Sequence, residues 1–152
     1  MLEYHKMTEE EKYCIARWKY PGEYAIYNSL SYEEQKKRGF GFANPENHLY
    51  SFYDGKELVG FINLNGEDPG VFFGIGVNPD CCGKGYGQQM TRMAWEISQT
   101  LFPGKPMYLE VRTWNQRAIR CYEKAGFRIV GEPIQQTTSI GEGAFYHMVR
   151  RG

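Results

Sequence analysis

What this sequence lacks argues against several kinds of protein. Its 152 residues contain no run close to the roughly 18 apolar residues that a membrane-spanning helix needs, and no signal peptide opens the chain. Its 18 basic and 18 acidic residues give a formal net charge of zero, whereas nucleic-acid-binding proteins normally carry a basic excess. We therefore expect neither a membrane nor a nucleic acid as partner.

Cysteine and histidine are scarce, and their spacing is not that of a metal site or a hydrolase. The four cysteines show no C-x-x-C spacing, and adjacent Cys81 and Cys82 cannot easily bridge each other. We expect free thiols, no bound metal and a reducing, cytoplasmic setting. The three histidines are isolated in the sequence, so a Ser or Cys hydrolase is poorly supported.

The chain has the length of one domain, and no linker or repeat divides it. A single domain over residues 1–152 is therefore expected, and the sequence leaves its oligomeric state open, a homodimer included. Capping patterns at Thr8 and Ser31 predict two helices, and Asp54-Gly55 between apolar runs predicts a hairpin. The expected class is mixed α/β, with further strands at 2–5, 71–77, 107–112, 127–131 and 144–150 and helices at 86–101 and 115–126.

The stretch "VNPDCCGKGYGQQM" has glycine at every second position from Gly83 to Gly87. It follows a predicted strand and precedes a predicted helix, whose first N–H groups and dipole favour an anion. Residues 79–130 hold 8 basic and 4 acidic side chains, which suits a phosphate-bearing ligand. A P-loop is excluded because Gly85 follows Lys84, and a dinucleotide fingerprint is disfavoured because Met90 stands where its last glycine belongs. A glycine-rich turn without a ligand is the remaining alternative.

A second motif, "LEVRTWNQRAIRCYEKAGF", follows at 109–127. Together the two resemble the pyrophosphate-binding motif and the next motif of the GNAT superfamily of acyl-CoA-dependent N-acetyltransferases. The second is most similar to the branch that acetylates ribosomal-protein N-termini. The resemblance covers roughly residues 49–150, and it implies a mixed, mostly antiparallel sheet flanked by helices, with acetyl-CoA between splayed central strands. One departure is Cys82, where the family usually has Arg or Gln, and weaker CoA binding is an open consequence.

The resemblance also implies roles for individual residues. Tyr122 would protonate the departing thiolate, and Glu110 would take up the proton of the acceptor ammonium. Proton transfer from a phenol of pKa ~10 to a thiolate whose thiol has pKa ~8.5 is uphill by about 2 kcal/mol. Proton transfer from an ammonium of pKa ~10.4 to a carboxylate whose acid has pKa ~4.3 is uphill by about 8 kcal/mol. Glu110 could therefore take up this proton if burial raised its pKa, if the pKa of the acceptor amine were lowered, or if a water molecule between the two groups carried the proton. The implied acetyl-CoA contacts are Ile75, Gly76, Val77, Cys82, Gly83, Lys84, Gly85, Tyr86, Gly87, Gln88 and Asn115.

Each of these residues also has a purely structural interpretation. Tyr122 can be a core residue, Glu110 an ion-pair partner, and Asn115 a plain helix cap. An aromatic cluster can form either a cation-binding acceptor pocket or part of the core: Trp18, Tyr20, Tyr24 and Tyr27. The predicted function is acetyl transfer to the primary amine of a small molecule or peptide. The alternative, favoured by Cys82, is an inactive CoA-binding sensor or interaction module.

Overall fold

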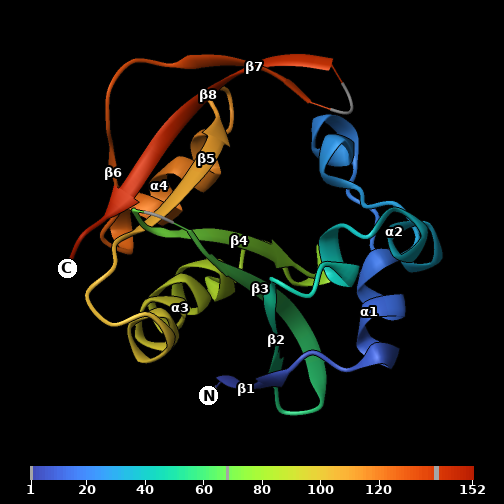
Figure 1. Ribbon diagram of the computed structural model, residues 1–152. Helices are drawn as coiled ribbons and strands as arrows, with labels where there is room; N and C mark the ends of the chain where they lie inside the picture. The colour runs from blue at the N-terminus through green and yellow to red at the C-terminus, as the bar shows by residue number, and fades with distance from the viewer. Residues whose placement is uncertain (1, 68, 139–140) are drawn as a thin grey trace.

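The structure is a computed structural model that describes residues 2–67, 69–138 and 141–152. Its strands form one sheet in the order β1-β2-β3-β4-β5-β8-β6, with β7 paired to β8 (Figure 1). The strands are β1 (Leu2–Lys6), β2 (His48–Asp54), β3 (Glu57–Gly66), β4 (Val71–Val77), β5 (Met107–Arg112), β6 (Arg128–Ile129), β7 (Ile134–Thr138) and β8 (Gly141–Arg150). The β4–β5 pair is parallel and the others are antiparallel, so the expected mixed, mostly antiparallel sheet is confirmed.

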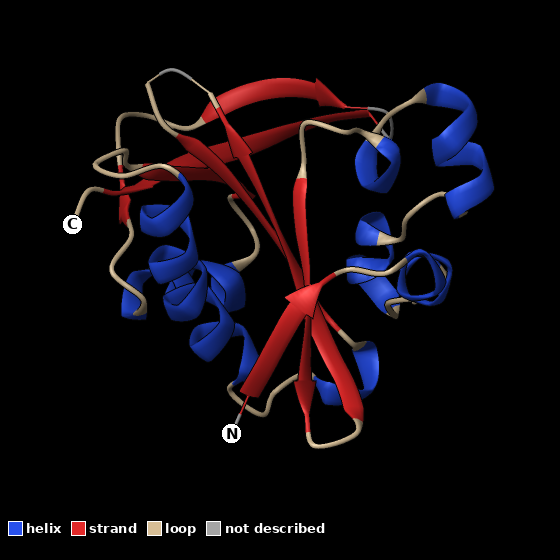
Figure 2. Ribbon diagram, turned by 60° about the horizontal axis from the view of Figure 1, so that its bottom comes forward, coloured by secondary structure: helices blue, strands red, loops and turns tan. Residues whose placement is uncertain are grey.

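Helices cover both faces of this sheet (Figure 2). The α-helices are α1 (Glu9–Ala16), α2 (Tyr32–Arg38), α3 (Tyr86–Leu101) and α4 (Gln116–Lys124), and the 3-10 turns are η1 (Gly22–Tyr27), η2 (Gly41–Ala43) and η3 (Pro79–Cys81). On β3, Ile62 and Leu64 belong to the core under α3, whereas Phe61 packs against the smaller core of α1 and α2. Within the described ranges no helix is both long and apolar enough to cross a membrane.

The predicted helix ends are confirmed where a side chain or a glycine sets them. Thr8 accepts a hydrogen bond from the N–H of Glu11, whose carboxylate accepts one from the N–H of Thr8 in return. Ser31 caps α2, and Gly39 ends it in the left-handed conformation with φ 67°. Asn115 caps α4 by accepting from the N–H of Ala118.

Two central strands separate, and this separation opens the site. β4 and β5 pair at Val71–Met107 and Phe72–Tyr108 only. Beyond these pairs β4 and β5 diverge, as the predicted splay requires, so the edge of β4 that does not pair with β3 faces open space. The structure thus leaves main-chain groups near the end of β4 available to a ligand.

Two elements differ from the sequence-based prediction. The strand expected at 127–131 is confined to Arg128–Ile129, and β8 begins at Gly141 rather than at 144 because its early residues pair with β7. β7 itself was not predicted, since "IQQTT" lacks the apolar alternation of a half-buried strand. The β7–β8 hairpin extends past β5 and lies above the diverging strands in Figure 1.

A buried carboxylate fastens α1 to the sheet away from the site. Glu11 accepts hydrogen bonds from Tyr53 at 2.5 Å, from Ser51 at 2.9 Å, from the N–H of Thr8 at 2.8 Å and, when its ring nitrogen is protonated, from His5 at 2.8 Å. Burial acts to raise the pKa of Glu11, but these donors outweigh it and lower the pKa to about 2. Because the folded-state pKa is depressed, ionised Glu11 stabilises the fold above pH ~4.5, and this stabilisation is lost as the pH falls toward 2.

We therefore expect Glu11→Gln to lower the free energy of unfolding by about 2–3 kcal/mol at pH 7. The variant should also lose less further stability than wild type between pH 5 and pH 3, because the titrating group is gone. Urea unfolding at pH 7, 5, 4 and 3 measures both effects. Glu10→Gln, at an exposed position of the same helical turn, is the control. Equal stability of the two variants at pH 7 would contradict this role for Glu11.

Candidate active site

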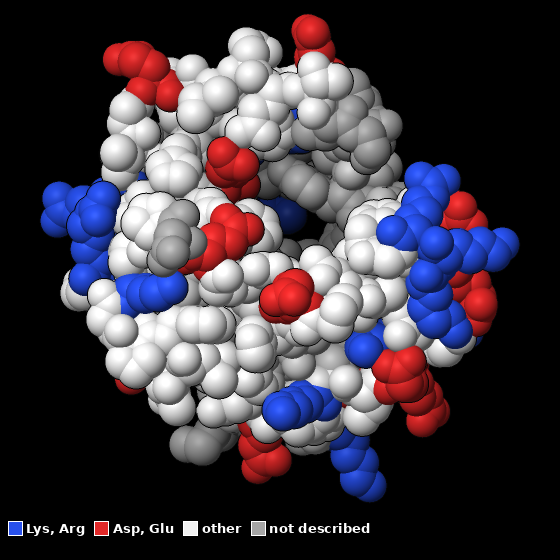
Figure 3. Space-filling view, viewed as in Figure 1, with Lys and Arg blue, Asp and Glu red and all other residues white. Residues whose placement is uncertain are grey.

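The main cleft lies where β4 and β5 diverge and has a volume of about 610 Å³. Its walls come from the second half of β4, the glycine loop, β5, the start of α4, and the segment from α1 to η1. The space-filling view shows a hollow in the middle of this face, with basic atoms inside it (Figure 3). A ligand in the cleft would touch both halves of the sheet.

The glycine loop has the geometry of an anion site. Gly83 and Gly85 line the cleft with φ of 81° and 83°, and a Cβ at either position would meet no protein atom within 4 Å. Gly85 precedes the first residue of α3 and offers no side chain to cap that helix. The N–H groups of the first turn of α3 are therefore left for a ligand, and the space beside the loop can hold a phosphate.

Gly87 lies where α3 approaches α4. A Cβ at Gly87 would lie 3.5 Å from the Sγ of Cys121 and 3.7 Å from a methyl group of Val77. The glycine loop, the end of β4 and the second turn of α4 consequently meet at one point of the cleft.

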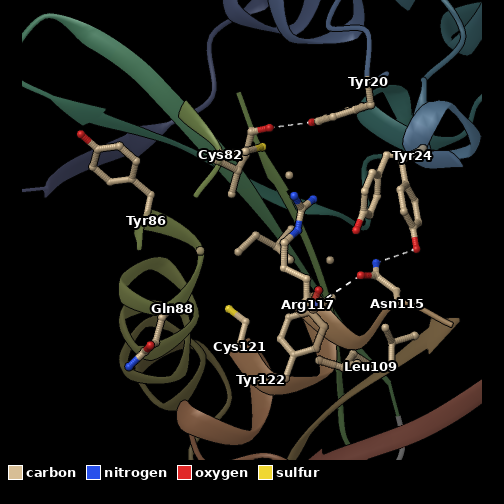
Figure 4. Close-up of a pocket in the computed structure, with 18 of the residues that line it drawn as sticks. Tyr20, Tyr24, Cys82, Tyr86, Gln88, Leu109, Asn115, Arg117, Cys121 and Tyr122 are labelled. Carbon is tan, nitrogen blue, oxygen red and sulfur yellow. Dashed lines mark hydrogen bonds between the residues drawn. The ribbon is translucent and has the colours of Figure 1, made fainter. Parts of the chain in front are cut away.

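The structure brings the predicted acetyl-CoA contacts together with one exception. Residues Ile75–Val77, 82–83, 85–88 and Asn115 line the cleft, whereas Lys84 does not. The side chain of Tyr86 turns away (Figure 4), and its hydroxyl donates to Asp54 at 2.6 Å. This hydrogen bond, together with burial, raises the pKa of Tyr86 to about 12. The contribution of Tyr86 to the site is thus its backbone.

Tyr122 projects from α4 into the same cleft (Figure 4). Its ring packs against those of Phe73 and Phe127, with centroids 6.4 Å and 6.1 Å away. Burial raises the pKa of Tyr122, with smaller contributions from Cys121 and Tyr27. The phenol therefore keeps its proton at neutral pH, but the tuning runs opposite to the downward shift that would make it a stronger acid.

Glu110 lines the cleft from β5 and is exposed. Its Oε2 accepts a hydrogen bond of 2.8 Å from the side-chain amide of Gln136 on β7. Because Glu110 is exposed, burial is not the means by which this carboxylate could receive an ammonium proton.

Asn115 connects the cap of α4 to η1. Its Oδ1 accepts from the N–H of Ala118, and its Nδ2 donates to the hydroxyl of Tyr27 at 3.0 Å. The Tyr27 ring lies against those of Tyr24 and Trp114. The predicted cap is confirmed, and the side chain also holds η1 at the cleft.

Sequence reasoning placed Tyr20 in an aromatic cluster but missed its main contact. Its hydroxyl donates to the carbonyl oxygen of Val77 at 2.8 Å, at the end of β4 where a thioester is expected to be aligned. Burial, and the neighbouring Cys82 thiol to a smaller extent, raise the pKa of Tyr20. No local sequence pattern links positions 20 and 77, so this contact could be identified only from the structure.

Arg117 was also missed. It extends from the first turn of α4 into the cleft, and its guanidinium lies 4.2 Å from the ring centroid of Tyr24 (Figure 4). The signal available in the sequence was its place two residues after the cap, inside the second motif. Among the described residues, no group of three His, Cys, Asp or Glu side chains is placed to hold a metal ion.

The model of the acetyltransferase (GNAT) family matches residues 10–127. The N-alpha-acetyltransferase RimI of Mycobacterium tuberculosis is 34% identical over 94 residues, which are 59% of this chain and 57% of that protein. The match therefore spans little more than half the length of this relative.

Solved structures share the fold. A spermidine N-acetyltransferase from Vibrio cholerae in complex with CoA and spermine superposes with a TM-score of 0.75 at 19% identity, covering 97% of this chain and 94% of that one. The ribosomal-protein-S18-alanine N-acetyltransferase from Escherichia coli gives 0.72 at 18% identity, covering 99% and 93%. At these identities the likeness concerns the fold alone, and it confirms the predicted fold class.

The family match includes both motifs that carried the resemblance, the glycine loop and α4 with Tyr122. RimI, to which this chain is similar in sequence, is an N-alpha-acetyltransferase, in agreement with the predicted likeness to an N-terminal acetyltransferase branch. The chain belongs to the acetyltransferase (GNAT) family.

Proposed function

We propose that the chain, acting as a single domain, is an acetyl-CoA-dependent N-acetyltransferase that acetylates a primary amine. The observation that carries this proposal is the placement of the glycine loop, Tyr122 and Glu110 around one cleft between diverging strands. Acetyl-CoA supplies a thioester and a diphosphate. The loop from Gly83 to Gln88 fits the diphosphate, and the main chain of Ile75–Val77 would align the thioester.

The reaction forms one C–N bond and breaks one C–S bond. The neutral amine attacks the thioester carbonyl carbon, the C–S bond breaks, and the thiolate takes the proton of Tyr122. The nitrogen loses its extra proton to solvent as the amide forms, and solvent returns a proton to the Tyr122 phenolate. The raised pKa of Tyr122 is no obstacle to this role. Desolvation that raises the pKa of a phenol also raises that of a thiol in the same place, as burial does for Cys121, so the difference between the two acids remains small.

Glu110 serves the acceptor side through water. The carboxylate is exposed and is held in place by Gln136, so it can order a water molecule that receives the ammonium proton and passes it to solvent. Direct transfer from an alkyl ammonium to an ordinary carboxylate would cost about 8 kcal/mol. For an α-amine, whose pKa is near 7.7–8.0, the same proton transfer costs roughly half as much free energy.

The relatives suggest which acceptors to test first. RimI is an N-alpha-acetyltransferase, and the Vibrio cholerae enzyme binds spermine, so peptide N-termini and polyamines belong in a screen with amino acids and aminoglycosides. Each acceptor is mixed with acetyl-CoA and protein, and released thiol is measured. Acetyl transfer to any amine supports the enzyme. CoA binding without turnover on every acceptor would favour the inactive sensor. We further propose a reducing cytoplasmic setting, supported by the four free cysteines.

We expect Glu110→Gln to slow turnover strongly near neutral pH and less at high pH. The reason is that free amine becomes abundant as the pH approaches the pKa of the acceptor, so the water held by Glu110 is needed less. The measurement is a kcat/KM profile from pH 6.5 to pH 10 with an acceptor from the screen. Glu67→Gln, at an exposed position outside the cleft, is the matched control. A loss that stays constant across this range would show that Glu110 is only structural.

A further inference from the structure

The glycine loop contributes no cation to the cleft. Lys84 is its one basic residue and does not line the cleft, and Cys82 stands where the family usually has Arg or Gln. Backbone N–H groups and a helix dipole can hold a diphosphate, but two negative charges normally attract a cationic side chain as well. A cation for this ligand must therefore come from another wall of the cleft.

The opposite wall, α4, supplies that charge. Arg117, Arg120 and Lys124 on this helix all line the cleft. Cys121 marks the face of α4 that meets the glycine loop, because its Sγ lies 3.5 Å from the place of a Cβ on Gly87. Arg117 stands four residues earlier, hence on the same face and one turn nearer the start of the helix.

The guanidinium of Arg117 lies in the same cleft that Cys82 and the glycine loop line. It rests over the ring of Tyr24, and Tyr20, four residues earlier, donates a hydrogen bond to the carbonyl oxygen of Val77 at the end of β4. The Arg117 side chain is exposed, and none of the described carboxylates forms an ion pair with it. A cation–π contact at an exposed site is weak, so Arg117 can exchange it for a bidentate contact with phosphate oxygens.

We propose that Arg117 binds the diphosphate of acetyl-CoA from the α4 side and stands in for the cation that position 82 lacks. This inference rests on the proposed function, since it requires that CoA binds in this cleft. It assigns Arg117 a role in ligand affinity, separate from the proton transfers of Tyr122 and Glu110. It also explains how a member of the family can have cysteine at position 82.

The first test is the affinity of Arg117→Gln for CoA and for dephospho-CoA, measured by calorimetric titration. Both ligands contain the diphosphate, so both should bind roughly 10–100-fold more weakly than to wild type. Arg128→Gln removes the same charge from an exposed strand outside the cleft and should change neither affinity. A loss restricted to CoA would assign Arg117 to the 3′-phosphate instead. A larger loss in Arg120→Gln or Lys124→Gln would assign the diphosphate to that residue. Either result overturns the proposal.

The second test is rescue. Cys82→Arg alone should tighten CoA binding slightly or leave it unchanged, and in the Arg117→Gln background it should restore most of the lost affinity. Additive effects of the two substitutions would show that position 82 and Arg117 do not serve the same group, which overturns the stand-in role. Wild-type protein that fails to bind CoA would instead refute the proposed function, so the two failures are distinguishable.

Discussion

Tyr122→Phe should lower kcat by about 10²–10⁴-fold while leaving CoA affinity near that of wild type. The substitution removes one hydroxyl and keeps the ring, whose packing against Phe73 and Phe127 is preserved. Without a positioned proton the thiolate must leave as an anion in an apolar site, where desolvation makes that anion costly. The raised pKa of Tyr122 reports the same desolvation.

Tyr50→Phe is the matched control, because burial also raises the pKa of Tyr50 but this tyrosine lies outside the main cleft. Turnover with a verified acceptor, CoA titration and thermal unfolding should be measured for both variants. Similar stability with a large loss of kcat in Tyr122→Phe alone would support the acid. Near-wild-type turnover of Tyr122→Phe would mean that water or another group protonates the thiolate.

Helix and turn boundaries could be predicted because they depend on neighbours in the sequence. The caps at Thr8, Ser31 and Asn115 act over three residues, and Gly39 ends α2 through its own backbone freedom. The same holds for the glycine loop, whose predicted place between a strand and a helix is confirmed. Where one residue and its near neighbours decide a structure, the sequence was sufficient.

Structure that depends on distant partners was not predictable in this way. β7 is a polar strand that exists because β8 offers it hydrogen bonds. η1 follows Pro21 and was not predicted, and it is held through Tyr27 by Asn115, 88 residues away. η1 supplies Tyr24 and Tyr27 to the cleft, and β7 holds Glu110 through Gln136, so contacts between distant segments shape part of the cleft wall.

The candidate site likewise has features that the sequence predicted and features that only the structure shows. Tyr122 and Glu110 were identified from a motif and share the cleft, but the structure changed how each is expected to work. Glu110 is exposed and not buried, and Tyr122 has a raised rather than a lowered pKa. Exposure and desolvation are set by the whole fold, which a motif does not report. Tyr20 and Arg117 were missed because their contacts cross the cleft between segments that no local pattern connects.

Gly85→Val should reduce CoA binding by more than about 100-fold, below detection in a titration at ordinary protein concentrations. Two effects combine. The φ of 83° at Gly85 is a conformation that a β-branched residue adopts at a cost of about 1–2 kcal/mol or more, so the start of α3 would shift. The added side chain would also occupy the open space beside the loop, where the diphosphate is expected to sit.

Gly104→Val separates these two effects. Gly104 has a φ of 80°, nothing within 4 Å of its added Cβ, and a position in the turn after α3, outside the cleft. It should therefore lose a similar amount of stability and keep its CoA affinity. Thermal unfolding and calorimetric titration of both variants give the comparison, with circular dichroism to establish that each is folded. If folded Gly85→Val bound CoA as tightly as Gly104→Val, the diphosphate could not lie against this loop, and the assignment of the cleft to acetyl-CoA would lose its main support.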